Sequence, residues 1–279
     1  MRRPALTLAI TLALAAPAAA QTADWRTPDP ENVWVIDTNQ GRILVELSPE
    51  LAPAHVERIR TLTRAEFYDT RTFFRVIEGF MAQTGDPMNN GTGASAMPDL
   101  EPEFSFRRGV GAGFAKASSA PPDDIARAST GLGFIGVMPV RSQPEMQMMM
   151  TADGKAPAWG LFCAGVAGMA RGEPENSANS QFFLMRDTRH TLDLKYTPFG
   201  RVISGLDVVR RIKTGEPVAE PQDRMTRVRL LSDLPEAERP QVQVMDTRGP
   251  AFRALVDATK AARGASFDIC DVEIPAKVG

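Results

Sequence analysis

Short apolar segments alternate with turn residues along most of the chain. Residues 33–38 and 42–47 are largely apolar and flank Asn39-Gln40-Gly41, which predicts a β-hairpin. Further apolar runs lie at residues 73–77, 80–83, 166–170, 181–185 and 199–203, and a closing strand is expected at 227–232. Short runs broken by Gly, Asn and Asp are typical of antiparallel sheets, so the pattern predicts a mainly β fold.

Three segments have helical spacing instead. Pro53 suits the first turn of a helix over residues 53–63, where apolar residues recur every three positions. A second helix is expected at 205–213 and a third at 251–263, the latter ended by Gly264. These helices are too few to change the fold class.

Two regions lie outside the regular pattern. Residues 105–168 contain a run rich in small residues and prolines, a Gly-x-Gly-x-x-Gly sequence at 131–136 and the methionine run 146–150. No strand is predicted before the glycines, so they indicate a flexible loop rather than a dinucleotide site. The methionines are more typical of an adaptable apolar surface than of a copper site. After a linker at 235–240, strands are expected at 242–245 and 267–274, around the third helix.

The N-terminus has the pattern of a secretory signal peptide. Arg2 and Arg3 precede an apolar stretch, and Ala18-Ala19-Ala20 provides a cleavage site, so residues 1–20 are predicted to be removed. The apolar stretch is too short for a membrane span, and no later segment predicts one. Residues 21–32 are expected to form a polar leader. The protein is therefore expected to be exported, to the periplasm in a Gram-negative bacterium and otherwise outside the cell.

Composition narrows the functional classes. The 279 residues include 43% hydrophobic and 24% charged residues, with a net charge of −2, which gives no support for nucleic-acid binding. The only histidines are His55 and His190, and the only cysteines are Cys163 and Cys270. These four scattered residues do not predict a zinc site. We expect His55 to lie on a helix surface and His190 in a polar loop, neither of them as a catalytic base.

The most specific pattern combines one arginine with apolar and amide side chains. Arg75 lies within a strongly apolar strand, and Met81 and Gln83 would share one face of the next strand. Gln181 and Phe183 would likewise share a face far downstream. Together these strands predict an apolar pocket with a few placed hydrogen-bond donors.

These segments resemble the cyclophilin family of peptidyl-prolyl cis-trans isomerases. The family pattern F-H-R-V-I-P-G-F-M-x-Q-G-G-D is met, with substitutions, by residues 73–86. Its N-G-T-G-G, E-F and S-Q-F-F patterns are met at 90–94, 103–104 and 180–183, and its L-D-G-K-x-x-x-F-G-x-V-x-x-G-x-D-V-V pattern at 192–209. The motifs follow in order from about residue 33 to residue 232, apart from the insertion.

The resemblance implies a closed eight-stranded antiparallel β-barrel capped by two helices. The domain would span 33–234, with 105–168 as an inserted lobe and 235–279 as a small α/β extension. It implies catalytic roles for Arg75, Phe80 and Gln83. The implied substrate-binding residues are Met81, Ala170, Arg171, Gln181, Phe183, Leu192 and Tyr196. Proline-containing polypeptides would be the substrates, with no cofactor or metal, and a monomer is favoured.

Some positions depart from the family pattern. Phe74, Glu78 and Thr84 replace a histidine, a proline and a glycine, and Arg171 and Tyr196 also differ from many members. Thr191 stands where many members have tryptophan, so we expect weak cyclosporin binding.

Four alternatives stay open at this stage. Arg75 would serve structure rather than catalysis if it paired with a carboxylate such as that of Glu78. The groove or the insertion would act as a holdase or assembly factor if it bound peptides without turnover. The insertion would form either a lobe beside the groove or a loop packed on the barrel. We hypothesise that Cys163 and Cys270 form a bridge, the alternative being two separate thiols.

Overall fold

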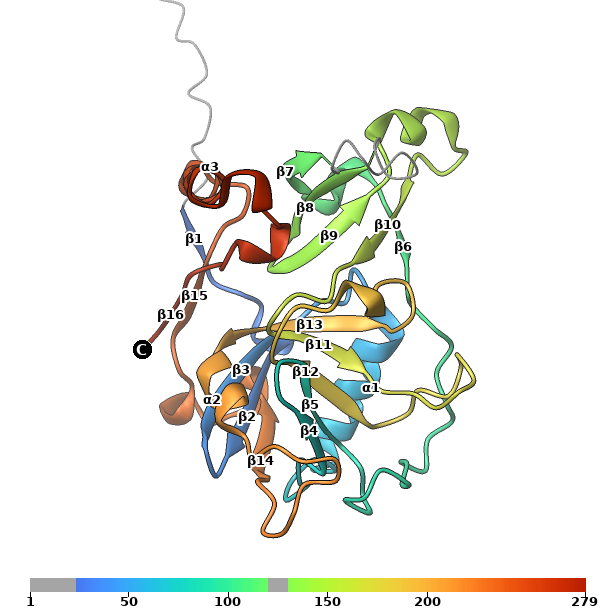
Figure 1. Cartoon of the computed structure of the whole chain (residues 1–279), viewed down its shortest axis with the longest axis vertical. Helices are drawn as coiled ribbons and strands as arrows, with labels where there is room; N and C mark the ends of the chain where they lie inside the picture. Colours follow the sequence, from blue (N-terminus) through green and yellow to red (C-terminus); the bar gives the residue numbers. More distant parts are fainter. Residues whose placement is uncertain (1–23, 120–129) are drawn as a thin grey trace, which may run out of the picture.

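Eight strands form one antiparallel sheet in a computed structural model that describes residues 24–119 and 130–279. The predicted signal peptide lies outside these residues. The strand order is β14-β2-β3-β13-β11-β12-β5-β4 (Figure 1). The strands are β2 (Val33–Thr38), β3 (Gly41–Leu47), β4 (Arg75–Ile77), β5 (Met81–Thr84), β11 (Val166–Met169), β12 (Phe182–Met185), β13 (Pro198–Ser204) and β14 (Met225–Leu230). The predicted mainly β fold and the hairpin β2–β3 are confirmed.

The sheet curls into an open half-barrel. Its ladder ends at β14 and β4, and an isolated bridge between Thr72 and Arg224 links the two edges. The outer edge of β4 is already occupied, because the backbone groups of Val76 pair with those of Gly215 in the loop after α2. The closed barrel expected from the sequence is therefore not confirmed.

The concave face of this sheet holds the main apolar core. Helix α1 (Pro53–Arg64) buries Val56 and Ile59 against it. The Trp34 ring packs on Phe182 with their centroids 4.8 Å apart, and the Trp34 indole donates to Thr63 Oγ1 at 2.8 Å. Helix α2 (Leu206–Arg211) is shorter than the predicted 205–213, because the backbone is already extended at Ile212. Among the described residues, no helix is both long and apolar enough to cross a bilayer.

Much of the insertion forms a second antiparallel sheet, of five strands in the order β6-β10-β9-β8-β7. These are β6 (Phe106–Arg108), β7 (Ala115–Ser119), β8 (Gly131–Ile135), β9 (Met138–Ser142) and β10 (Ala156–Gly160). The predicted flexible loop at 131–136 is wrong, since β8 is buried throughout. A Cβ on Gly133 would lie 2.3 Å from the Ala115 carbonyl oxygen, so glycine here permits close strand approach. Met146, Met149 and Met150 of a 3-10 helix (Glu145–Met150) are exposed.

The C-terminal extension forms a third sheet, in the order β1-β15-β16. Strand β1 (Trp25–Arg26) belongs to the predicted leader, and it pairs with β15 (Val242–Met245), which was predicted. The strand predicted at 267–274 is wrong, because a capping box at Asp268 starts a 3-10 helix (Ile269–Asp271) there. Strand β16 (Ala276–Val278) follows later in the chain.

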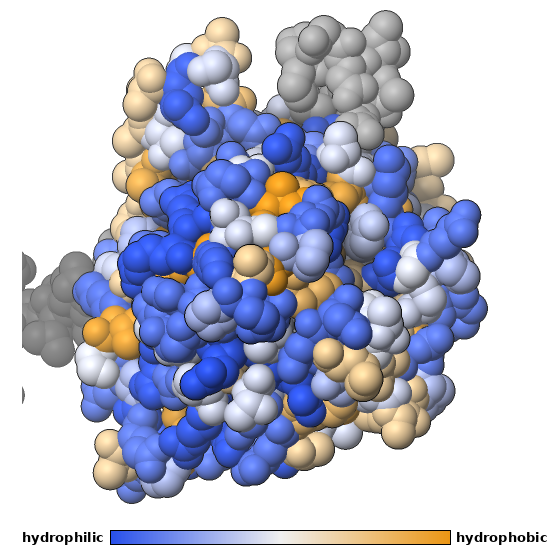
Figure 2. Space-filling view, turned by 60° about the horizontal axis from the view of Figure 1, so that its bottom comes forward, coloured by the Kyte–Doolittle hydropathy of each residue, from blue (hydrophilic) through white to orange (hydrophobic). Residues whose placement is uncertain are grey.

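The two additions lie together. Helix α3 (Pro250–Arg263) and the second sheet lie on the same side of the main sheet, drawn above it in Figure 1. A disulfide between Cys163 and Cys270 joins the chain just before β11 to the extension, as hypothesised. On the mainly hydrophilic face in Figure 2, hydrophobic residues gather in a few patches.

Candidate active site

A pocket of about 160 Å³ brings together nine of the ten site residues expected from the sequence. It is lined by Arg75, Phe80, Met81, Gln83, Ala170, Arg171, Phe183, Leu192 and Tyr196. The tenth, Gln181, lines an adjoining pocket of about 340 Å³ that shares Gln83, Ala170 and Arg171 with the first. The two pockets form one extended groove, which suits a peptide segment better than a small compact ligand.

Strand pairing explains why these side chains meet. Arg75 of β4 lies opposite Gln83 of β5, and Gln83 lies opposite Phe183 of β12. Residues directly opposite one another in antiparallel strands point to the same side of the sheet. Two neighbouring strands and a third that lies about 100 residues downstream therefore place a guanidinium, an amide and an aromatic ring in one row.

The polar side of the groove is a chain of hydrogen bonds. Arg75 Nη1 donates to Gln83 Oε1 at 3.2 Å, and Gln83 Nε2 donates to Gln181 Oε1 at 3.0 Å. Gln181 Nε2 then donates to the Gly93 carbonyl at 2.8 Å. Both amides are thus fixed in orientation: Gln181 holds the Gln83 amide, and Gln83 holds the Arg75 guanidinium.

A second acceptor holds Arg75 from the other side. Arg75 Nε donates to Glu216 Oε1 at 2.5 Å. Arg75 therefore does pair with a carboxylate, as the structural alternative supposed, but the partner is not Glu78, which pairs with Arg186 at 2.8 Å. Sequence reasoning missed Glu216, which lies 141 positions from Arg75 in a loop without any recognised motif.

The apolar side of the groove is built from packed aromatic rings. Phe183 stacks on Phe162 with centroids 5.8 Å apart and meets Tyr196 edge to face at 5.7 Å. The Arg171 guanidinium lies 4.8 Å from the Tyr196 ring centroid and donates to the Lys195 carbonyl. Two neighbouring rings therefore support Phe183, which holds its side chain in the wall of the pocket that Arg75 also lines.

The two histidines lie outside the groove. His55 is buried rather than at the surface, and its Nδ1 lies 2.7 Å from Glu103 Oε2. His190 begins a 3-10 turn and contacts Asp193 at 2.9 Å and Asp268 at 3.2 Å. These two carboxylates, Asp193 first, raise the pKa of His190 to about 9. The ring is therefore a cation at neutral pH and links the groove rim to the extension.

One group of described residues has metal-ligand spacing. His190, Asp268 and Cys270 place their ligand atoms within 4.8 Å of one another. However, the Cys270 sulfur is bonded to Cys163 and provides no thiolate. These residues do not fit a metal centre in this state.

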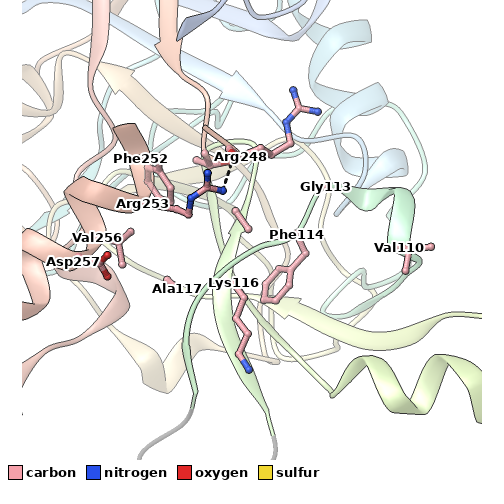
Figure 3. A pocket seen from close by; sticks show the side chains of 12 residues that line it. Val110, Gly113, Phe114, Lys116, Ala117, Arg248, Phe252, Arg253, Val256 and Asp257 are labelled. Atoms are coloured by element: carbon pink, nitrogen blue, oxygen red, sulfur yellow. Dashed lines mark hydrogen bonds between the residues drawn. The ribbon is translucent and has the colours of Figure 1, made fainter. Parts of the chain in front are cut away.

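A separate cavity of about 440 Å³ lies between the second sheet and helix α3. Figure 3 shows Phe114 from the insertion and Phe252 and Val256 from α3 among its lining residues, with Lys116 and Arg253 beside them. It lacks the row of amides that accompanies Arg75. The groove around Arg75 is therefore the better candidate for chemistry.

Comparisons with known proteins agree on one family. A sequence model of the family described as "Cyclophilin type peptidyl-prolyl cis-trans isomerase/CLD" matches residues 33–232. A "Probable peptidyl-prolyl cis-trans isomerase" of Brucella suis is 35% identical over 224 residues, which are 76% of this chain and 86% of that protein. The "Peptidyl-prolyl cis-trans isomerase-like 1" of Aspergillus fumigatus is 32% identical over 178 residues, covering 64% and 80%.

A solved structure matches most of the chain. The crystal structure of the cyclophilin AquaCyp293 from Hirschia baltica superposes with a TM-score of 0.81 at 34% identity. The match covers 91% of this chain and 93% of that one. Coverage this high extends well beyond residues 33–232, so the match includes residues outside the family domain.

Proposed function

This chain belongs to the cyclophilin-type peptidyl-prolyl cis-trans isomerases, and we propose that it isomerises X-Pro bonds of exported polypeptides in the groove around Arg75. The observation that carries the site assignment is the row of Arg75, Gln83 and Phe183 across three paired strands. A fixed guanidinium beside an apolar pocket provides a hydrogen-bond donor and a binding surface for the proline ring.

The barrier arises from the amide itself. Partial double-bond character in the X-Pro bond gives a barrier of about 18–20 kcal/mol, and the uncatalysed reaction takes tens to hundreds of seconds. Twisting the bond removes conjugation, so the prolyl nitrogen becomes pyramidal and gains a lone pair. A group that donates hydrogen bonds to this nitrogen stabilises the twisted state more than either planar state, which lowers the barrier.

In our proposal Arg75 is that donor. A guanidinium has five N–H groups and stays charged at all relevant pH values. Gln83 and Glu216 accept one N–H each, so three remain for the substrate. The proline ring would lie against Phe183 and Met81, while the residues on the other side of the bond rotate. This route needs no covalent intermediate, metal or cofactor.

The test compares the mature wild type with Arg75→Ala, using NMR exchange or a protease-coupled assay on an Ala-Pro-Phe peptide. Loss of a donor aimed at the reacting atoms typically lowers kcat about 10²- to 10³-fold, and we expect a loss in that range. Arg107→Ala is the matched control, because Arg107 is also an exposed arginine paired with a carboxylate, Asp153. Equal rates for Arg75→Ala and the control would rule out the assigned role.

The export of the protein is part of the proposal. It rests on the signal-peptide pattern of residues 1–20 and is supported by the Cys163–Cys270 disulfide, since such bonds persist in oxidising compartments. Slow proline steps limit the folding of many proteins, which gives an exported isomerase a role in their maturation. Fractionation of cells and mass determination of the mature N-terminus test this, and a cytoplasmic, uncleaved protein would contradict it.

A non-catalytic peptide-binding role is the second candidate. Met146, Met149 and Met150 are exposed on the 3-10 helix between β9 and β10, and exposed methionines make adaptable contacts with apolar chains. An aggregation assay with an unfolded, proline-free client separates this role from catalysis. Suppression of aggregation by Arg75→Ala as efficient as that by wild type would support a holdase activity beside the isomerase.

A further inference from the structure

Among the residues that the structure describes, Glu216 is the acidic residue that pairs with Arg75 in the groove. Its Oε1 accepts from Arg75 Nε at 2.5 Å, and its side chain is 56% exposed. The Arg75 side chain is 37% exposed. A contact between two partly exposed side chains matters only if the backbone holds both partners in place.

The backbone does hold Glu216. Its neighbour Gly215 exchanges two hydrogen bonds of 2.8 Å with Val76, the residue after Arg75. Two positions beyond Glu216, the Val218 amide donates to the Phe74 carbonyl at 2.9 Å, and the Val218 side chain is buried in the main core. Glu216 is thus anchored on both sides to the segment that carries Arg75.

The rest of the loop is also fixed. The Lys213 amide donates to Asp223 Oδ2 at 2.8 Å, and Lys213 Nζ donates to the Ala219 carbonyl at 2.6 Å. Gln222 accepts from the Thr72 hydroxyl. The carboxylate of Glu216 is therefore placed by the fold rather than by a freely moving surface loop.

We propose that Glu216 is a positioning residue for the isomerisation and that its charge disfavours acidic side chains beside the proline. This inference rests on the function proposed above. With Gln83 at Nη1 and Glu216 at Nε, the guanidinium plane is held from two sides, which fixes the positions of the N–H groups left on Nη1 and Nη2. An arginine with only one of these acceptors would have to lose rotamer freedom in each catalytic cycle.

The charge acts on the substrate directly. Other cations line the groove, notably Arg171, so the net preference of the wild type is not set by Glu216 alone. The effect of Glu216 is therefore measured as the difference in peptide preference between the wild type and a variant without the charge. Removal of its charge raises the relative rate for acidic peptides, and the gain falls with salt because the group is exposed.

Three variants separate the two effects. Glu216→Gln keeps an acceptor but removes the charge, and Glu216→Ala removes both. Glu236→Gln is the control, since Glu236 is an exposed carboxylate in the C-terminal extension. Rates are measured on acetyl-Ala-Xaa-Pro-Phe-amide, with Xaa as Lys, Gln or Glu, over a range of peptide concentrations, together with thermal melts.

For the neutral peptide, we expect Glu216→Ala to lower kcat about three- to ten-fold with a small change in KM, and Glu216→Gln to retain most of it. Both variants should raise the Glu-to-Lys rate ratio about two- to five-fold at low salt, and less at high salt. In an Arg75→Lys background, Glu216→Ala should have no further effect on kcat, because lysine has no Nε–H donor of this geometry.

Each contrary result has a definite meaning. Unchanged kcat and unchanged peptide preference in Glu216→Ala, with an active wild type, overturn the inference and leave the proposed function intact. Glu216→Ala could instead lower kcat by the same factor in the wild-type and in the Arg75→Lys backgrounds, together with a lower melting temperature. That result would show a purely structural role for Glu216 and would also overturn the inference. An inactive, folded wild type refutes the proposed function itself.

Discussion

Removal of the disulfide should strongly destabilise the protein. Cys163 and Cys270 are separated by 107 positions, so the bond closes a long loop in the unfolded chain. Loss of the loop-closure constraint costs about 4.7 kcal/mol for a loop of about 100 residues in the chain-entropy model, and measured losses are commonly about 2–5 kcal/mol. We therefore expect the free energy of unfolding to fall by about 3–5 kcal/mol in the double variant Cys163→Ala/Cys270→Ala.

Alanine is the appropriate replacement. Cys163 is fully buried in an apolar cluster, where a serine hydroxyl would add a desolvation cost of its own. Any small cavity left by the sulfur adds to the loss in the same direction. The expected figure is thus set mainly by the cross-link and not by a new polar group.

Urea unfolding of the mature protein measures this loss. Trp34 lies in the main core and Trp159 in the second sheet, so fluorescence reports on both parts. The free energy of unfolding should fall more steeply with urea concentration in the variant, because the unfolded chain of the variant is less compact. Reductant should bring the wild type to the stability of the variant and leave the variant unchanged. A difference below about 1 kcal/mol, the size of an average point mutation, would refute the reasoning.

Three further predictions concern the groove and its rim. Asp193 and Asp268 raise the pKa of His190 from 6.5 to about 9, so the His190 cation stabilises the fold fully below pH 6.5, and this contribution is lost as pH rises through about 9. In urea unfolding, the free energy of unfolding should therefore fall more between pH 6 and pH 10 for the wild type than for His190→Gln. Thr191→Trp should tighten cyclosporin binding about ten-fold by calorimetry, and a submicromolar dissociation constant for the wild type would contradict the premise. Phe183→Ala should lower kcat/KM for proline peptides at least about ten-fold, with the larger part of the effect in KM, because it removes the stacked wall of the pocket; an unchanged KM would exclude that wall as the proline contact.

The strands could be predicted where turn residues and apolar runs agreed, but the glycines of one strand led to the wrong prediction of a loop. Residues 131–135 form a buried strand although two of its five residues are glycines, which usually weaken strands. The reason is tertiary. Gly133 lies against the backbone of Ala115 and the ring of Phe114, where no side chain fits. A single sequence does not reveal which strand will lie so close.

The lining of the groove could be predicted almost completely because its residues occur in a few dense motifs, whereas their catalytic and substrate-binding roles stay predictions. Arg75 and Gln83 lie eight positions apart on neighbouring strands, and Phe183 lies in a short aromatic motif. Glu216 could not be predicted in this way. Its contact with Arg75 depends on the backbone pairing of Gly215 with Val76, which only the folded chain shows.

The apolar character of β12 explains how the additions support the groove without lining it. All four residues of β12 are buried, with Phe182 in the main core and Phe183 in a second apolar cluster on the opposite face. This second cluster also contains Phe134 from the insertion and Phe252 from α3. A strand that is apolar on both faces needs a covering layer on each side. The insertion and the extension provide the second layer, so they support the wall of the groove from behind and are more than appendages to the domain.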